Sequence, residues 1–323
     1  MPRILSTGHT QNYVIKVIYK DKKFSNMKKL GFYFLLNALL FAFLMVSCKD
    51  DFDYPLPEPE VEVKPRLNVS DSLTLIKIYE ALGPWDGERW DYSDYTTWAG
   101  LTAAYDVDTK EIRAVGLQVY GGIEGTLPDE ICDLTELRCL DLIGGQGRIP
   151  ENIGKLKHLQ YLRLCSNQLR GGIPESIGNL RELKELRLMG SLLDDTIPES
   201  IGKLTNMEDL VIFDTQMKGN IPRGIANWSK LRRVVLKKNH FSGSVPIEIL
   251  ANKHAGFSFE ENDITELPWE VWDDNFDAEP PYLVRNRLSG EIPSWVLKTK
   301  KWQHYHYVVG KQQDGYGYSY PKE

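Results

Sequence analysis

Eight prolines recur along the chain at nearly constant spacing, and each follows Ile, Leu or Val. They are Pro128, Pro150, Pro174, Pro198, Pro222, Pro246, Pro268 and Pro293. The successive intervals are 22, 24, 24, 24, 24, 22 and 25 residues. A period of this length indicates a stack of similar coils, because one coil cannot bury its apolar side without a neighbour. Such a stack offers a long shared surface for binding and no evident cleft for catalysis.

The apolar pattern between the prolines is clearest in four coils, which run Leu159 to Pro174, Leu183 to Pro198, Met207 to Pro222 and Leu231 to Pro246. In the second coil, the alternation of Leu186 and Leu188 predicts a strand with one apolar side. Asn167 and Asn239 follow their strands by three residues, where a side-chain amide can bond to turn backbone. A tight bend is expected where glycine stands three residues before the proline. These glycines are Gly171, Gly219, Gly243 and Gly290.

This pattern resembles the plant-type leucine-rich repeat L-x-x-L-x-L-x-x-N-x-L-x-G-x-I-P-x-x-I-G-x-L over residues 112–307. The resemblance implies an α/β solenoid. Such a stack is curved and right-handed, with a parallel sheet on its concave side and short 3₁₀ or irregular segments on its convex side. Residues 144–147 depart from the pattern in a shortened coil, and residues 268–292 lose the strand pattern, with an interruption at 272–281.

The last coil is expected to close the stack with bulky side chains. The spacing after Pro293 places Val296, Trp302, Tyr305 and Tyr307 at core positions. Large aromatics at the end of a repeat array can cover its exposed apolar edge. Residues 308–323, rich in Gly and Tyr, are expected to form a terminal tail.

Residues 68–111 predict a cap at the other end of the stack. Asn68 begins a run that favours a helix N-terminus, and Gly83 followed by Pro84 predicts its end. The apolar face is expected to hold Leu73, Ile76, Tyr79 and Leu82. The following segment, with Trp85, Trp90 and Trp98, resembles the cap of plant-type repeat ectodomains through Trp98-Ala99-Gly100-Leu101. Those caps usually carry paired cysteines, which are missing here, so tryptophan packing is expected to seal the stack.

The N-terminal 47 residues predict an export signal. Lys28 and Lys29 precede an apolar run from Leu30 to Val46, and Met27 is the expected true start. The residues before Cys48 (LMVS) resemble the lipobox of bacterial lipoproteins, which implies lipidation of Cys48 and a membrane-anchored protein. Lys49-Asp50-Asp51 resembles an acidic tag that directs lipoproteins to the outer face of the outer membrane. An uncleaved membrane anchor is the alternative, because 17 apolar residues lie at the lower limit for a bilayer span.

Residues 48–67 carry four prolines and alternating charges, which predicts a semi-rigid spacer between the anchor and the folded part. Without residues 1–47, the chain has 32 Lys and Arg against 44 Asp and Glu, a formal charge of −12. This excess of acidic residues argues against a nucleic-acid partner.

The cysteines beyond Cys48 do not predict a disulfide framework, because three remain, namely Cys132, Cys139 and Cys165. Cys139 and Cys165 fall on neighbouring strands but four residues out of register. That offset is about 13 Å, which exceeds the reach of a disulfide. Free thiols in or beside the core are therefore expected.

The outward side chains of the strands are expected to form columns across the concave face. The middle column is predicted to contain Gly116, Asp141, Arg163, Arg187, Val211, Val235, Ser258 and His306. A central patch mixes Arg, Met and aromatic side chains, a composition typical of protein-binding surfaces. The candidate partner-binding residues are Tyr161, Arg163, Arg187, Met189, Asp209, Val211, Phe213 and Arg233. An ordinary solvated sheet face is the alternative interpretation.

The sequence contains no catalytic or zinc-binding motif, so we expect neither an enzyme nor a cofactor. His304 and His306 alternate on a predicted final strand, but no third metal ligand is evident. Residues 273–279 place oxygen ligands as the opening of a calcium loop does, although Ala278 and Val284 stand where Gly and Glu belong. We therefore expect no resident metal, and calcium at 273–279 stays a minor hypothesis.

The favoured function is a monomeric cell-surface lipoprotein that binds a protein or peptide through its concave face. A glycan-binding adhesin or capture lipoprotein is the first alternative, suggested by Trp269, Trp272 and Trp295 near the interrupted coil. A structural envelope protein without a specific ligand is the second.

Overall fold

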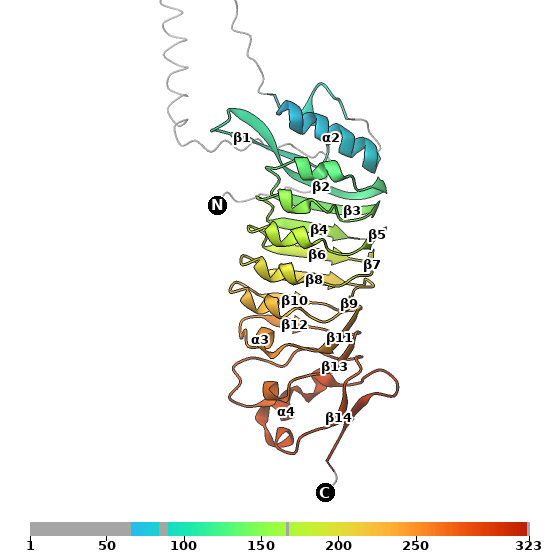
Figure 1. The fold of residues 1–323 in the computed structure, drawn as a ribbon, viewed down its shortest axis with the longest axis vertical. Coiled ribbons are helices and arrows are strands. Elements are labelled where there is room, and N and C mark those ends of the chain that lie inside the picture. The colour runs from blue at the N-terminus through green and yellow to red at the C-terminus, as the bar shows by residue number, and fades with distance from the viewer. Residues whose placement is uncertain (1–65, 84–89, 166–167, 322–323) are drawn as a thin grey trace, which may run out of the picture.

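The computed structural model describes residues 66–83, 90–165 and 168–321. Its coils stack one on the next along the long axis, with a helix and a hairpin at one end and the C-terminus at the other (Figure 1). The predicted export signal, lipobox and spacer up to residue 65, and Trp85 of the cap, lie outside the described residues. The repeated prolines therefore predicted the architecture of the stack correctly.

A parallel sheet runs through the stack in the order β2-β3-β4-β6-β8-β10-β12. Its strands are β2 (Glu111–Thr126), β3 (Cys139–Gly147), β4 (Tyr161–Cys165), β6 (Glu185–Met189), β8 (Asp209–Phe213), β10 (Arg233–Val235) and β12 (Gly256–Ser258). β1 (Leu101–Asp106) pairs with β2 antiparallel and forms the edge next to the cap. One inward column, Leu140, Leu162, Leu186, Leu210 and Val234, is aligned by register and fully buried, as the strand alternation predicts.

A second row of short strands follows the bend of each coil. β5 (Gln168–Gly171) pairs with β3 and with β7 (Leu192–Leu193), and β9 (Lys218–Gly219), β11 (His240–Ser244) and β13 (Asp263–Glu266) form a sheet of their own. β14 (Ser289–Glu291) pairs with β15 (Gly317–Ser319) instead. The predicted tight bends are confirmed, because Gly171, Gly219, Gly243 and Gly290 all have positive φ.

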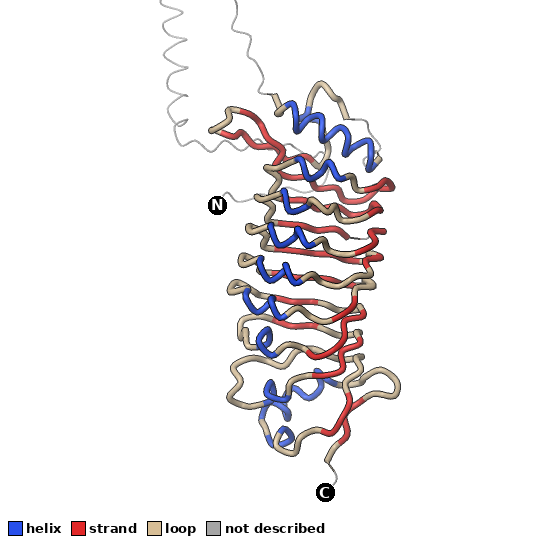
Figure 2. The backbone as a smooth tube through the Cα atoms, viewed as in Figure 1, coloured by secondary structure: helices blue, strands red, loops and turns tan. Residues whose placement is uncertain are grey.

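Short helices after the repeated prolines form a column on another side of the coils (blue in Figure 2). They are η3 (Asp129–Asp133), η4 (Ile153–Lys155), η5 (Glu175–Asn179), η6 (Glu199–Lys203), η7 (Arg223–Asn227), α3 (Ile247–Leu250) and η8 (Trp269–Trp272). Glycine lets successive helices pack closely, since a Cβ on Gly178 would lie 2.6 Å from the carbonyl oxygen of Ser200. The Ile-Gly pair of the repeat thus sets the distance between coils on this side.

The cap helix α2 (Val69–Leu82) begins at Asn68, whose side chain accepts a hydrogen bond from the Asp71 amide, and ends at Gly83. Its ends were predicted correctly, and its buried face was predicted in part, since Tyr79 and Leu82 are buried and Ile76 is partly buried. Leu73 is 58% exposed, and the helix also buries Leu75 and Ile78. The predicted face followed a spacing of three, whereas the helix buries a stripe at spacings of three, one and three.

Aromatic stacking joins the cap helix to the segment that follows it. The rings of Tyr79 and Trp90 have centroids 4.5 Å apart, and those of Trp90 and Trp98 are 4.7 Å apart and nearly parallel. Trp90 and Trp98 are buried. The short helix η2 (Tyr95–Thr97) lies between Trp90 and Trp98 in the sequence. Tryptophan packing seals this end of the stack, as the missing cysteines suggested.

A buried ion pair fixes the cap helix to β2. The Asp71 carboxylate is almost fully buried and accepts from Arg113 Nε at 2.9 Å, from Arg113 Nη2 at 3.0 Å and from the Ala114 amide at 2.9 Å. The hydrogen bond to Asp71 raises the pKa of Arg113 above its ordinary value. The backbones of α2 and β2 also approach each other closely, since a Cβ on Gly125 would overlap the carbonyl oxygen of Ala81. The cap therefore docks through one charged anchor and one close backbone contact.

The repeat continues through residues 268–292, although a single bridge stands there in place of a sheet strand. Tyr282 pairs with Ser258 in parallel, and the amide of Phe259 donates to the Tyr282 carbonyl at 2.8 Å. Leu283 and Asn286 occupy the leucine and asparagine positions of a further coil and are fully buried. The correction is that residues 273–281 make a longer connection between two coils and do not break the array.

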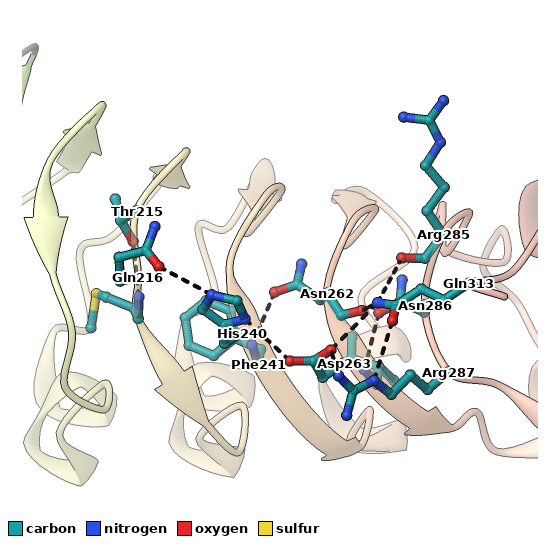
Figure 3. Close-up of polar contacts among 12 residues, drawn as sticks. Thr215, Gln216, His240, Phe241, Asn262, Asp263, Arg285, Asn286, Arg287 and Gln313 are labelled. Atoms are coloured by element: carbon teal, nitrogen blue, oxygen red, sulfur yellow. Dashed lines mark hydrogen bonds and ion pairs between the residues drawn. The ribbon is translucent and has the colours of Figure 1, made fainter. Parts of the chain in front are cut away.

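Asparagine side chains continue through the C-terminal coils as a buried ladder. The Asn239 amide donates to the carbonyls of Ile212 at 2.9 Å and Lys237 at 3.0 Å, which confirms its predicted role. Asn262 and Asn286 also donate to the carbonyls of preceding residues, and their own oxygens accept from the amides of Phe241 and Ile264 (both asparagines are labelled in Figure 3). Gln312 ends the ladder with a bond to the Val309 carbonyl at 2.6 Å. Asn167 lies outside the described residues.

The last coil differs from its prediction, because it forms helices where a strand was expected. After η9 (Val296–Lys298), residues 300–309 form α4 (Lys300–Tyr305) and η10 (His306–Val309). Val296 and Trp302 are buried as predicted, but Tyr307 is 52% exposed and does not help to close the core. Residues beyond 308 pack into the fold, since Gln312 is buried and β15 pairs with β14.

Candidate functional site

The outward side chains of β2, β3, β4, β6, β8, β10 and β12 form one continuous surface, which we call the sheet face. Strand register confirms most of the predicted middle column, from Asp141 through Arg163, Arg187, Val211 and Val235 to Ser258. At its two ends the prediction was wrong. Gln118 pairs with Asp141 in place of Gly116, and Tyr282 follows Ser258 while His306 lies on a helix.

The predicted arginines are already paired with carboxylates of the same chain. Arg163 Nη1 lies 3.2 Å from an Asp141 oxygen, and Arg163 Nε donates to Glu185. Arg187 Nε lies 2.7 Å from a Glu185 oxygen. The hydrogen bond to Glu185 raises the pKa of Arg163 above its ordinary value. These four groups carry two positive and two negative charges, so they present a fixed and balanced network to a partner.

The remaining charged and aromatic candidates surround this network. The Arg163 guanidinium lies 5.6 Å from the Tyr161 ring centroid, within cation–π range. Arg233 pairs with Asp209 at 3.3 Å. The structure thus brings the predicted residues together on one face, but Arg163, Arg187 and Arg233 are already paired with carboxylates of this chain.

An apolar column runs beside the charged network on the same face. Cross-strand register aligns Tyr120, Ile143, Cys165, Met189 and Phe213 across β2, β3, β4, β6 and β8. Tyr120 is exposed and the other four side chains are half-buried. We call these five residues the apolar column. It is continuous because parallel pairing places the same strand position of each coil beside its neighbour, although the intervals along the chain vary between 22 and 24 residues.

A cluster of tyrosines lies at the C-terminal end of the same face, where the sequence interpretation missed it. Tyr282 and Tyr307 are 47% and 52% exposed, and their ring centroids lie 6.5 Å apart. Tyr305 lies 6.5 Å from Tyr307, and its hydroxyl donates to Glu279 at 3.1 Å. Tyr305 and Tyr307 had been assigned to the core. The spacing from Leu283 to Asn286, which matches the repeat, could have placed Tyr282 on the sheet face.

The three tryptophans proposed for glycan binding lie in different environments. Trp272 is fully buried and packs edge-on against Trp302 at a centroid distance of 4.8 Å. Trp269 is half-buried against Tyr318, and Trp295 is exposed. Trp272 is therefore a core residue, contrary to the prediction, because the proline before η8 turns it inward as in the other coils.

The loop considered for calcium is organised around a lysine. Lys301 Nζ donates to the carbonyls of Phe276 and Ala278, the latter at 2.8 Å. The Asp274 carboxylate accepts from the amides of Lys300 and Lys301 at the start of α4, and Asp277 pairs with Lys253 at 2.8 Å. Lysines and backbone amides therefore already engage two carbonyls of this loop and the Asp274 and Asp277 carboxylates. In the part of the chain that the structure describes, no three His, Cys, Asp or Glu side chains come together to hold a metal ion.

Cys132, Cys139 and Cys165 are free thiols, and the positions of Cys139 and Cys165 agree with the predicted register. Cys139 pairs with Tyr161 and Cys165 with Ile143, four residues apart along the strands. Burial raises the pKa of the Cys132 thiol to about 12 and also raises the pKa values of Cys139 and Cys165. The thiols stay protonated at neutral pH, which removes the thiolate that nucleophilic chemistry requires.

The described ranges contain no helix of the length and hydropathy needed to cross a bilayer. This finding leaves the apolar run at residues 30–46 untested, because that run lies outside those ranges.

Comparison with known proteins supports the fold. The family model described as "Leucine-rich repeat region" matches residues 112–252. A plant ice-binding protein matches with a TM-score of 0.53 at 20% identity, over 80% of this chain and 89% of that protein. A comparison with curated proteins found no match.

Two plant receptor ectodomains are also similar over part of the chain. One is that of GASSHO1/SCHENGEN3 from Arabidopsis thaliana, in complex with CASPARIAN STRIP INTEGRITY FACTOR 2. It is 32% identical over 53% of this chain and 21% of that chain, with a TM-score of 0.47. The other is the plant peptide hormone receptor RGFR1 in complex with RGF2, 30% identical over 55% and 29%, with a TM-score of 0.49. The chain thus spans less than a third of either receptor ectodomain. Residues 112–252 thus match the leucine-rich repeat model, and the strand register and repeat pattern show that the chain folds as a solenoid of this type with a helical, tryptophan-rich N-terminal cap.

Proposed function

We propose that this protein binds a protein or peptide partner through its sheet face. The observation that carries the proposal is the apolar column, which leaves partly exposed apolar side chains side by side on a rigid sheet. Contiguous exposed apolar surface rimmed by polar groups marks interaction sites in soluble proteins. Aromatic and Met side chains, such as Phe213 and Met189, are enriched where protein partners bind.

The charged residues have a different role in this proposal from the one the sequence suggested. Because Arg163 and Arg187 are held by Asp141 and Glu185, a partner carboxylate would have to compete with carboxylates already in place. The network instead gives one border of the site a fixed shape, while the half-buried Met189 and Phe213 supply the contact and Val211 is itself buried. Tyr161, Asp209 and Arg233 flank it. Charged residues at the border of an interface contribute more to specificity and to the rate of association than to affinity.

A pair of matched substitutions tests this assignment. Phe213→Glu places a charge in the apolar column and is expected to weaken capture of the partner by about tenfold or more, because a buried contact must then desolvate a carboxylate. Leu192→Glu is the control, since Leu192 is also an exposed apolar residue but lies on β7, away from the sheet face. Quantitative affinity capture on the immobilised mature protein measures both. Equal loss, or no loss, in the two variants would remove the sheet face from the proposal.

We further propose that the protein is displayed on the outer surface of a bacterial outer membrane by a lipid on Cys48. The support is the resemblance of residues 44–48 to a lipobox, the acidic residues that follow and the proline-rich spacer. Cys48→Ala is expected to abolish incorporation of labelled palmitate and to release the protein from the membrane fraction. Digestion of intact cells with a protease checks the orientation. Labelling that persists in the variant would contradict lipidation at Cys48.

A further inference from the structure

A pocket opens where the second row of strands separates. β9, β11 and β13 pair with one another, but β14 pairs with β15, so β13 and β14 diverge after the hydrogen bond from the Arg287 amide to the Ile264 carbonyl. The pocket between them has a volume of about 280 Å³, with Thr265 and Glu266 on one side and Ser289 on the other. Figure 3 shows the neighbouring polar contacts from Asp263 to Arg287 and Gln313 that hold the coils together just before this separation.

Two aromatic rings form one wall of this pocket. Trp269 on η8 and Tyr318 on β15 both line it and pack against each other, with ring centroids 4.9 Å apart and planes at 50°. Both side chains are half-buried, so each is held in place while part of it stays accessible. Burial raises the pKa of Tyr318 above its ordinary value, which keeps the phenol neutral. The wall is therefore uncharged and rich in π electrons.

Two carboxylates on the same pocket lack a positive partner. Glu266 and Glu270 line it and are exposed, and within the described ranges neither forms an ion pair. Acidic residues nearby do pair, for example Glu248 with Arg223 at 3.3 Å and Asp263 with Arg287 at 2.8 Å. No Lys or Arg lines the pocket. The pocket therefore carries negative charge that a cation from outside the protein can pair with.

We propose that this pocket binds an organic cation, an ammonium or guanidinium group, between the rings of Trp269 and Tyr318 and the carboxylates of Glu266 and Glu270. Aromatic faces attract cations that lie within about 6 Å, and carboxylates add a direct charge attraction. The hydroxyls of Thr265 and Ser289 can accept hydrogen bonds from such a group. A volume near the lower end of the range for ligand pockets suits one cationic head group and its stem. The site is separate from the sheet face and does not depend on the function proposed there.

The cation could come from a Lys or Arg side chain of a polypeptide or from a free amine. A neutral sugar is a different ligand that could also stack on Trp269. The two carboxylates without an ion-pair partner favour the cation, because a cation gains a charge attraction that a neutral ligand lacks. Binding of a sugar in place of the cation is therefore an outcome that contradicts the proposal.

Ligand-observed NMR titration of the mature protein tests the site. The probes are Nα-acetyl-lysine methylamide, Nα-acetyl-arginine methylamide, spermidine, the uncharged Nε-acetylated lysine amide, glucose and N-acetylglucosamine. The charged probes are expected to bind, more weakly as salt rises, and acetylation is expected to abolish binding. Stronger binding of the amino-acid amides would indicate a polypeptide side chain as the natural source, and stronger binding of spermidine a free amine.

Charge-neutral variants locate the site. The double variant Glu266→Gln, Glu270→Gln is expected to weaken the charged probes by about tenfold or more, because the shape is kept and the charge is lost. Glu291→Gln is the control, since Glu291 is an exposed carboxylate on β14 that does not line the pocket. The proposal fails if the double variant binds the charged probes as the wild type does, if no charged probe binds the wild type, or if the sugars bind and the cations do not.

Discussion

Replacing Asp71 with alanine is expected to lower the free energy of unfolding of the N-terminal cap by about 3–5 kcal/mol. The substitution leaves the partly buried Arg113 guanidinium without its two hydrogen bonds and the buried Ala114 amide without an acceptor. Removing one partner of a buried ion pair is costly because the remaining charge stays in a site of low polarity. The cap should therefore detach before the coils unfold.

Hydrogen exchange measured by mass spectrometry separates the cap from the rest of the stack. In Asp71→Ala the amides of residues 69–82 are expected to exchange much faster, while those of β8 and β10 keep their protection, because coils contact only their neighbours. Glu80→Ala is the control, since Glu80 is exposed on the same helix. Gly125→Ala should reproduce the effect by blocking the approach of Ala81. Cap protection unchanged in Asp71→Ala would show that the ion pair does not hold the helix.

The second large effect is expected for Asn286→Ala in the C-terminal coils. The Asn286 amide donates to the carbonyls of Phe259 at 2.9 Å and Leu283 at 3.0 Å, and its oxygen accepts from the Ile264 amide at 3.0 Å. Each buried polar group left without a partner costs about 1–3 kcal/mol. With three such groups, a loss of about 3–5 kcal/mol is expected after partial relaxation.

Urea unfolding followed by tryptophan fluorescence measures this loss, because Trp272 and Trp302 pack together in the same region. Asn227→Ala is the matched control, since Asn227 is exposed at the end of η7. A loss below about 1 kcal/mol for Asn286→Ala would mean that water replaces the amide and that the asparagine ladder does not support these coils.

The sequence predicted the middle of the stack well because four successive intervals of 24 residues keep every strand in phase. Arg163, Arg187 and Val211 therefore lie where the pattern placed them. At the N-terminal end the column was misplaced by two residues, because β2 pairs with both β1 and β3 and its register shifts after Tyr120. That irregularity comes from sheet pairing and leaves no mark in the spacing of apolar residues.

At the C-terminal end, the sequence pattern placed two aromatic residues wrongly. Tyr307 fits a core spacing but lies on a short helix, and Trp272 was taken for a surface residue although the proline before it turns it inward. The pairing of Arg163 with Asp141 and Glu185 could not be deduced from composition, because it depends on rotamers across three strands. The lysine that fills the loop at 273–279 comes from α4 and is distant in sequence.

Photo-crosslinking in intact cells tests the central claim of partner binding through the sheet face most directly. A photoreactive residue is placed at position 189 or 213 in the apolar column and, as a control, at position 192 on β7. We predict that positions 189 and 213 capture the same protein, that excess purified mature protein competes for it, and that position 192 does not capture it. Capture of the same protein from position 192 with equal yield, or no competed product from either column position, would contradict the account.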